Sequence, residues 1–153
     1  MKITETEIIQ KYLRDLTFNN KSSLMLKDDV FYNKKKSFII STDTYIENKH
    51  FLKNTNPKNF IKKIFRSSIS DIICKGVQPK TYFLSLSLNK ISKIWLKNFK
   101  NIFSSESKKY GLFLGGGDIV KSKKLSFTFT VLGYVKKKPI LRSNASLLDD
   151  IYV

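Results

Sequence analysis

The chain has 153 residues, enough for one domain with a substantial hydrophobic core. Hydrophobic residues make up 41% of it, which excludes a disordered tail, and no apolar run approaches the roughly 20 residues that span a bilayer. The formal charge is +17, but the lysines are spread through every segment, so we expect a solvated basic surface and no nucleic-acid partner. The N-terminus carries acids and no apolar signal segment, and one cysteine excludes an intrachain disulfide; we expect a cytoplasmic protein without a membrane partner.

The first part of the chain predicts one helix and two strands. Residues 5–16 have apolar side chains on one side of a helix. Residues 23–32 predict a strand that is interrupted by Lys27-Asp28-Asp29. Residues 37–45 predict a second strand, whose apolar start gives way to hydroxyls and an aspartate.

Two long helices and three further strands are expected after this point. Proline at the first helical position and glycine after the last one delimit the first of these helices. The elements are a helix from Pro57 to about Lys75, a strand over 82–88, a helix over 91–109, and strands over 111–114 and 125–131. The residues from Leu148 to Val153 suggest the start of another strand. This order predicts an α+β fold, with a mixed or antiparallel sheet covered by helices on one face.

A run of glycines, Gly115 to Gly117, stands between the predicted strand 111–114 and Asp118. Glycine lets a backbone adopt a positive φ or approach a phosphate closely. The run matches neither the Walker A loop nor the dinucleotide fingerprint. Taken alone, it predicts a tight turn that is capped by Asp118.

Aspartates are placed on separate predicted elements, although the chain has only 12 acidic residues. Asp43 ends a strand, Asp71 lies on a helix, Asp118 follows the glycines, and Asp28-Asp29 interrupt a strand. Oxygen ligands of this kind suit a divalent cation such as magnesium, which commonly bridges carboxylates and phosphates. The alternative for Asp71 is a buried carboxylate hydrogen-bonded to a neighbouring loop. A zinc site is excluded because the chain has one cysteine and one histidine.

Five short motifs in this order and spacing resemble the thiamine-monophosphate kinase family. They are Ser41-Thr42-Asp43-Thr44, His50-Phe51, Ser70-Asp71, Gly116-Gly117-Asp118 and Leu141-Arg142-Ser143. The resemblance runs from about Asp28 to Val153. The wider superfamily includes aminoimidazole ribonucleotide synthetase, selenophosphate synthetase and a hydrogenase maturation factor.

The resemblance implies a fold like the N-terminal domain of aminoimidazole ribonucleotide synthetase, in which two sheets pair into a barrel across a homodimer. It also implies that ATP lies between the paired domains with magnesium ions. Residues 1–153 are then a single ATP- and magnesium-binding N-terminal domain, and the family's C-terminal domain is absent from this chain. The implied reaction is ATP-dependent phosphorylation of thiamine monophosphate to thiamine diphosphate, for which the isolated domain is incomplete and no protein nucleophile is needed.

Roles for individual residues follow from the resemblance alone. The implied magnesium ligands are Asp29, Ser41, Thr42, Asp43, Asp71 and Asp118. Gly117, Asp118 and Arg142 are implied to meet ATP, and His50 the phosphate of the substrate, with Asp28 and Tyr110 as weaker candidates.

The chain departs from the family pattern at two places. Lys27 replaces a glycine that the family usually has before its paired aspartates, and 143–148 replace part of a glycine-containing turn. Three other functions stay open: another ATP-dependent enzyme of the superfamily, a non-catalytic nucleotide-binding dimerisation module, and a basic nucleic-acid binder. For His50 the alternative is an ordinary surface histidine.

Overall fold

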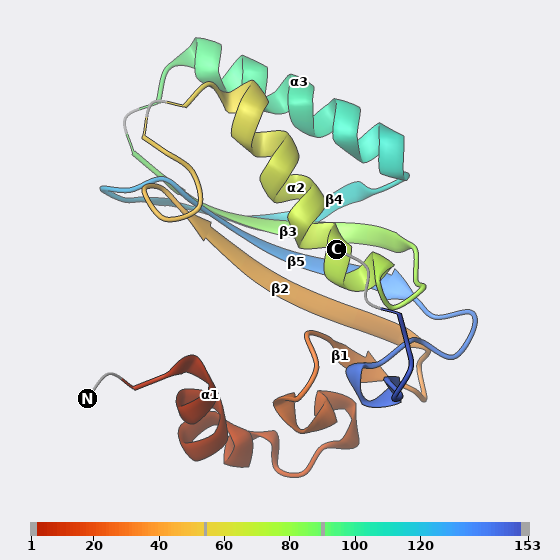
Figure 1. Cartoon of the computed structure of the whole chain (residues 1–153). Coiled ribbons are helices and arrows are strands. Elements are labelled where there is room, and N and C mark those ends of the chain that lie inside the picture. Colours follow the sequence, from red (N-terminus) through yellow and green to blue (C-terminus); the bar gives the residue numbers. More distant parts are fainter. Residues whose placement is uncertain (1–2, 54, 90, 151–153) are drawn as a thin grey trace.

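A computed structural model of the chain contains a five-stranded sheet with two long helices on one face (Figure 1). It describes residues 3–53, 55–89 and 91–150. The sheet and its helices are β1 (Phe31–Asn33), β2 (Phe38–Ile46), α2 (Pro57–Ile73), β3 (Pro79–Leu88), α3 (Lys93–Tyr110), β4 (Phe113–Lys121) and β5 (Ser126–Tyr134). The shorter helical segments are α1 (Glu5–Ile8), η1 (Ile9–Leu13), η2 (Arg14–Thr17), η3 (Lys21–Leu26) and η4 (Arg142–Asn144). In the part of the chain that is described, no helix has the length and apolar character to cross a membrane.

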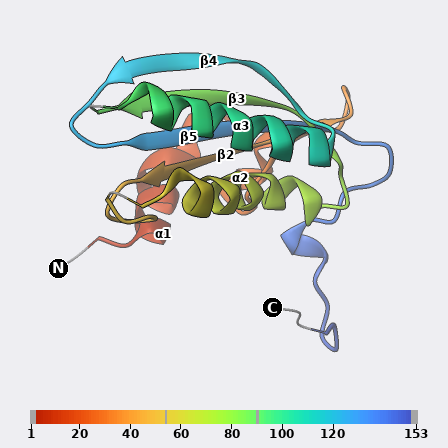
Figure 2. The same ribbon diagram turned by 90° about the horizontal axis from the view of Figure 1, so that it is seen from above.

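The strands lie in the order β1-β2-β5-β3-β4. Every neighbouring pair is antiparallel except β3 and β4, which are parallel and connected through α3. Both α2 and α3 lie on the same side of the sheet (Figure 2). The predicted α+β fold, a mixed sheet with helices on one face, is therefore confirmed.

The core lies between the helices and one face of the sheet. Along β5 the alternation predicted from the sequence is present, because Phe127, Phe129 and Val131 are buried while the threonines between them are half-buried on the opposite face. From α2, Phe65 packs edge-on against Phe129, with ring centroids 6.2 Å apart. From α3, Phe103 stacks on the same Phe129 ring at 5.9 Å. One aromatic cluster thus joins both helices to the central strand.

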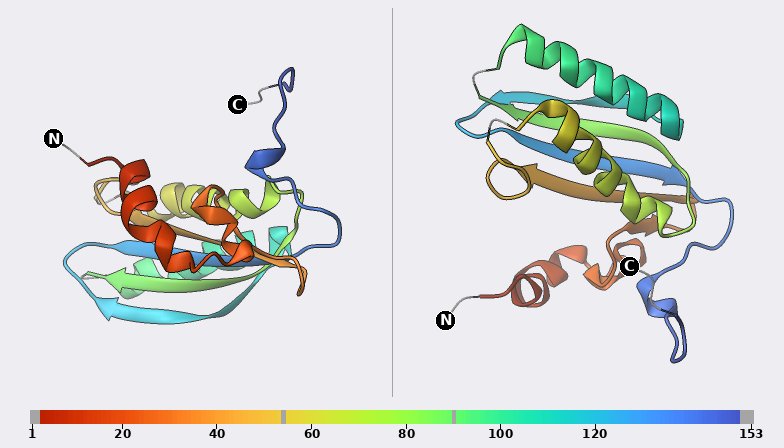
Figure 3. Two further views of the ribbon diagram at one scale, coloured as in Figure 1. Left: turned by 90° about the horizontal axis from the view of Figure 1, so that it is seen from below. Right: turned by 45° about the horizontal axis from the view of Figure 1, so that its top comes forward.

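The opposite face of the sheet, which we call the open face, carries short polar side chains. Thr42 and Thr44 on β2 are hydrogen-bonded to Thr130 and Thr128 on β5, with oxygen–oxygen distances of 3.1 and 2.9 Å. The N-terminal helical segments and the C-terminal segment extend beyond the sheet–helix body (Figure 3). The open face therefore pairs its hydroxyls within the sheet instead of burying an apolar layer.

The N-terminal part of the chain differs from the prediction. The helix expected over 5–16 is present as α1, η1 and η2, but its apolar residues Tyr12 and Leu16 are more than 60% exposed. The strand expected over 23–32 is wrong, because η3 occupies Lys21–Leu26 and only Phe31 and Tyr32 of that range lie in a strand, β1. A short apolar run does not by itself distinguish a strand from a helical turn.

Two further expectations about local structure differ from the structure, one at the glycines and one at the end of the chain. The turn predicted at Gly115 to Gly117 is wrong, because these residues lie inside β4, where Gly115 forms a bulge opposite β3. A Cβ built on Gly117 would lie 1.9 Å from the backbone oxygen of Leu84, so the close approach of β4 to β3 requires glycine there. Of the strand suggested for 148–153, residues 148–150 are not in a strand and 151–153 lie outside the described residues.

Replacing Gly117 with alanine should destabilise the domain by about 1–3 kcal/mol or more, because the new methyl group meets backbone that cannot rotate away. The matched control is Gly111→Ala at the end of α3, where φ is +68° and the nearest atom to a Cβ is 3.7 Å away. That control should lose only about 1 kcal/mol, from the left-handed backbone. Urea denaturation followed by circular dichroism measures both, and equal losses would contradict the steric argument.

Candidate functional site

Three of the predicted site residues meet where β2 passes beneath the end of α2. Ser41 and Asp43 alternate onto the side of β2 that faces α2, and Asp71 lies on the last turns of that helix. The hydroxyl of Ser41, which is 3% exposed, donates to Asp71 Oδ2 over 2.9 Å. A strand with period two and a helix packed across it therefore bring two carboxylates to one place from positions 28 residues apart.

This acidic group carries surplus negative charge. Burial raises the pKa of Asp43, and the nearby charge of Asp71 raises it further. The Tyr45 hydroxyl donates to Asp43 Oδ2 over 3.3 Å, which opposes that shift. Burial also raises the pKa of Tyr45 to about 12, so this tyrosine stays protonated and keeps its role as a donor at neutral pH.

The paired aspartates that precede β1 are neutralised by two cations. Lys75 Nζ lies 2.7 Å from Asp28 Oδ1, and both side chains are almost completely buried. Burial alone would raise the pKa of Asp28, but the Lys75 ammonium and the Arg142 backbone N–H hold it below its ordinary value. The guanidinium of Arg142 donates to Asp29 Oδ1 over 2.6 Å.

The C-terminal segment delivers Arg142 to this place. After β5 the chain returns beside the end of α2, where the Ile140 N–H donates to the Lys75 carbonyl over 3.1 Å (Figure 1). The Arg142 N–H then donates to Asp28 Oδ2 over 2.8 Å. The structure thus places the predicted nucleotide residue Arg142 in direct contact with the predicted magnesium ligand Asp29.

His50 lies in the loop after β2 and is connected to the acidic group through Tyr45. Its Nδ1 accepts from the Ile46 backbone N–H over 2.9 Å, which puts the proton of the neutral ring on Nε2. The ring meets Tyr45 edge-on at 5.6 Å, and the side chain is exposed. His50 is at the surface, but a backbone hydrogen bond fixes which nitrogen it offers to a ligand.

Other predicted residues are not brought to this group within one chain. The side chain of Thr42 is on the open face, bonded to Thr130. Gly117 and Asp118 lie in β4, at the far edge of the sheet from β2, with β5 and β3 between them. Tyr110 ends α3 and packs against Phe65 in the core. Among the described residues, no three His, Cys, Asp or Glu side chains are close enough together to hold a metal ion.

Sequence reasoning did not identify Lys75 and Tyr45 as part of this site. Tyr45 was accessible to such reasoning, because it stands two residues after Asp43 and a strand places both on one face. Lys75 carries no such signal, since its partner Asp28 is far away in the sequence and meets it only through the packing of α2.

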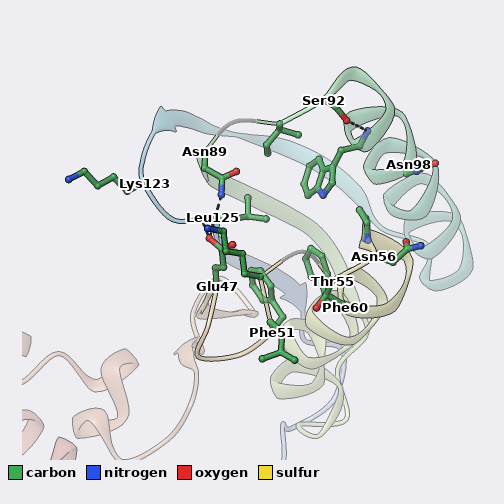
Figure 4. A pocket seen from close by; sticks show the side chains of 15 residues that line it. Glu47, Phe51, Thr55, Asn56, Phe60, Asn89, Ser92, Asn98, Lys123 and Leu125 are labelled. Atoms are coloured by element: carbon green, nitrogen blue, oxygen red, sulfur yellow. Dashed lines mark hydrogen bonds between the residues drawn. The ribbon is translucent and has the colours of Figure 1, made fainter.

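A cavity of ≈ 760 Å³ lies at one end of the sheet, apart from the acidic group (Figure 4). Its walls come from the loop after β2, the starts of α2 and α3, and the segment before β5. Glu47, Phe51, Phe60 and Asn89 are among the side chains that line it. None of the predicted metal, nucleotide or substrate residues lines this cavity.

A family model and several curated proteins are similar in sequence to this chain. Residues 26–135 match the family described as AIR synthase related protein, N-terminal domain. The thiamine-monophosphate kinase of Buchnera aphidicola subsp. Acyrthosiphon pisum (strain APS) is 37% identical over 158 residues, which cover 100% of this chain and 49% of that protein. The thiamine-monophosphate kinase of Haemophilus influenzae is 33% identical, again over 100% of this chain, and 48% of its own length is covered.

Solved structures agree with these relatives. The structure described as AaThiL complexed with AMPPCP and TMP has a TM-score of 0.77 and 25% identity, covering 96% of this chain and 48% of the other. Thiamine monophosphate kinase from Aquifex aeolicus has a TM-score of 0.68 and 23% identity, covering 84% and 45%. The chain spans about half the length of the curated relatives that it matches. The resemblance predicted from the five motifs is confirmed, and the chain belongs to the AIR synthase related protein family, whose N-terminal domain residues 26–135 match.

Proposed function

We propose that the protein to which this domain belongs transfers the γ-phosphoryl group of ATP to the phosphate of thiamine monophosphate, yielding thiamine diphosphate and ADP. The observation that carries this proposal is the similarity along the whole chain to proteins named thiamine-monophosphate kinase. A structure with AMPPCP and TMP, which matches 96% of this chain, supports the same two substrates. The reaction is expected in the cytoplasm and needs the part of the protein that this chain does not include.

The reaction joins two polyanions. An oxygen of the acceptor phosphate bonds to the γ-phosphorus, the bond from that phosphorus to the β,γ-bridging oxygen breaks, and ADP leaves with the electron pair. No protein nucleophile takes part, so the residues of the protein act through charge and positioning. The chain offers two kinds of groups for this purpose, a set of carboxylates and a set of cationic or neutral N–H donors.

Magnesium suits the acidic group at β2 and α2. The donors there are carboxylate and hydroxyl oxygens of Asp43, Asp71 and Ser41, and the raised pKa of Asp43 indicates negative charge that a cation would stabilise. Magnesium is usually held by one or two carboxylates together with substrate phosphates, so a cluster of three acids is not required. When bound, it supplies charge neutralisation of the phosphate oxygens. Asp29 and Thr42 stay proposed ligands.

Two donors are oriented for phosphates. Arg142 presents its guanidinium beside Asp29, where it would meet nucleotide phosphate when it leaves that carboxylate. His50 presents Nε2 because Nδ1 is engaged with the backbone, and we assign this atom to the acceptor phosphate. His50 follows the last residue of β2, whereas Arg142 lies near β1, which pairs with the start of β2, so the two donors flank the acidic group from opposite ends of the strand.

A homodimer is part of the proposal. The predicted ligands Gly117 and Asp118 lie at the opposite edge of the sheet from Asp43, so a second copy has to bring them to the acidic group. Apolar side chains along β4, including Ile119 at 68% exposure, offer a surface for that contact. Pairing of two such sheets into a barrel agrees with this exposed edge.

The metal proposal predicts that ATP binding depends on a divalent cation and on Asp71. Asp71→Asn keeps the size of the side chain but removes a ligand charge, so metal-dependent ATP affinity should fall by about 1.5–3 kcal/mol. The control is Asp15→Asn, which removes the same charge from an exposed position in η2. Titration calorimetry with ATP, with and without EDTA, measures the effect; binding unchanged by EDTA and by Asp71→Asn would refute the proposed metal site.

His50→Ala, introduced into the full-length enzyme, should raise KM for thiamine monophosphate and leave KM for ATP nearly unchanged, because the residue meets only one substrate. The loss in kcat/KM should correspond to about 1.5–3 kcal/mol, as for a hydrogen bond to a charged group. His50→Gln retains a neutral N–H donor and should recover part of the loss. Steady-state kinetics with each substrate varied decides the matter: equal effects on both substrates indicate a structural role.

Self-association should be observable in solution. At tens of micromolar, a concentration on the order of typical interface dissociation constants, the domain should sediment as a dimer. Ile119→Lys on β4 should give a monomer, because it places a charge in the proposed contact. Ile94→Lys changes an equally exposed isoleucine on α3 and should leave the dimer intact. A monomer for the unaltered chain, or equal effects of both variants, would count against the proposed dimer.

A further inference from the structure

The cavity at the end of the sheet has the size of a small-molecule site. Its volume of ≈ 760 Å³ lies in the range of about 300–1,000 Å³ that such sites occupy. It is bounded by separate elements, because the loop after β2, α2, α3 and the segment before β5 all contribute (Figure 4). None of the residues given a role in the proposed reaction lines it, so its polar groups call for another explanation.

A buried carboxylate forms part of the cavity wall. Glu47 is 6% exposed, and its Oε2 accepts from the backbone N–H of Leu125 at 3.1 Å and from Asn89 Nδ2 at 3.4 Å. Both donors are neutral, and no basic side chain among the described residues pairs with Glu47. A buried carboxylate is costly unless donors or a cation compensate it. Both of these hydrogen bonds go to Oε2, and no donor among the described residues is bonded to Oε1, so this oxygen can accept from a guest.

Flat aromatic surfaces form two other walls. Phe51 and Phe60 stack face to face, with ring centroids 4.4 Å apart and an angle of 8° between the rings. Trp95, which lines the same cavity from α3, stacks on Phe99 at 5.3 Å. Such surfaces favour a planar guest, and the face of tryptophan attracts one that carries positive charge. Asn98, also from α3, adds an amide that can donate or accept.

We propose that this cavity binds an amino-substituted planar heteroaromatic ring, whose amino group donates to Oε1 of Glu47 and whose face lies against Trp95. Two compounds of the proposed reaction carry such a ring, the aminopyrimidine of thiamine and the adenine of ATP. The lysines Lys53 and Lys123 also line the cavity and are exposed, so a phosphate on the guest would strengthen binding. The choice of these two compounds as probes rests on the proposed function, whereas the cavity and its chemistry do not.

Trp95 provides a direct readout, because it is the only tryptophan in the chain. The domain is titrated with thiamine and with adenosine in EDTA, so that the proposed metal site does not contribute. Saturable quenching of Trp95 fluorescence by thiamine alone assigns the cavity to the acceptor, and quenching by adenosine alone assigns it to the nucleotide. Benzyl alcohol, which is aromatic but has no amino group, should bind at least about tenfold more weakly than the better probe.

Glu47→Gln keeps an acceptor for Leu125 but removes the charge, and should weaken binding of the better probe by about tenfold or more. Lys97→Ala, on the same helix as Trp95 but outside the cavity lining, should have no effect. If Glu47→Gln fails to fold, Asn98→Ala is the second variant. It removes the amide that α3 contributes to the cavity lining and should weaken binding severalfold. Circular dichroism establishes the fold of each variant.

The proposal is overturned if neither probe quenches saturably, if benzyl alcohol binds as well as the amines, or if folded Glu47→Gln and Asn98→Ala both bind like the unaltered chain. Asp71→Asn should leave the quenching in EDTA unchanged. If that variant loses metal-dependent ATP binding and retains quenching, the metal site and the cavity are two separate sites. Conversely, absent quenching with intact metal-dependent ATP binding removes the cavity proposal and leaves the proposed function standing.

Discussion

The buried ion pair between Lys75 and Asp28 connects three segments that are far apart in the sequence. Lys75 follows α2, Asp28 precedes β1, and the C-terminal segment bonds to both, through Ile140 to the Lys75 carbonyl and through Arg142 to Asp28. Breaking a buried pair by removing one partner leaves an uncompensated charge, which costs more than the pair contributes. The positions of Asp29, next to Asp28, and of Arg142, which donates to Asp28, therefore depend on this contact.

The pair also makes the arrangement sensitive to acid. In the folded chain the pKa of Asp28 lies below its ordinary value, so the unfolded chain takes up a proton at higher pH than the folded one. The stabilisation by this group is complete above the unfolded pKa and is lost as the pH falls through the folded pKa. Asp43 has the opposite sign, because burial and Asp71 raise its pKa. The two carboxylates thus respond to pH in opposite ways, because Asp28 is paired with a lysine and Asp43 is buried near a second carboxylate.

Local rules predicted the elements whose signals are complete within a few residues. Pro57 gave the start of α2, Gly76 gave its end to within two residues, and the alternation after Leu125 gave β5. The motifs singled out Ser41, Asp43 and Asp71, which the structure brings together, whereas the period of β2 places Thr42, proposed beside them, on the opposite face. The predictions that failed depend on contacts between residues far apart in the sequence. Gly117 looks like a turn residue until the Leu84 oxygen is known to lie against it.

The ion pair between Asp29 and Arg142 joins a proposed metal ligand to a proposed nucleotide ligand. The N–H of Arg142 that donates to Asp29 over 2.6 Å is engaged there, while the other donors of the guanidinium stay available, and a carboxylate so engaged is a poorer metal ligand. Under the proposed function, an anion that drew Arg142 away would make Asp29 available to a cation, and a cation on Asp29 would release that donor. Linkage requires that each ligand raise the affinity for the other by the same factor. If the proposed metal and phosphate sites are correct, the contact between these two side chains would couple them, and metal and phosphate would bind together more readily than either binds alone.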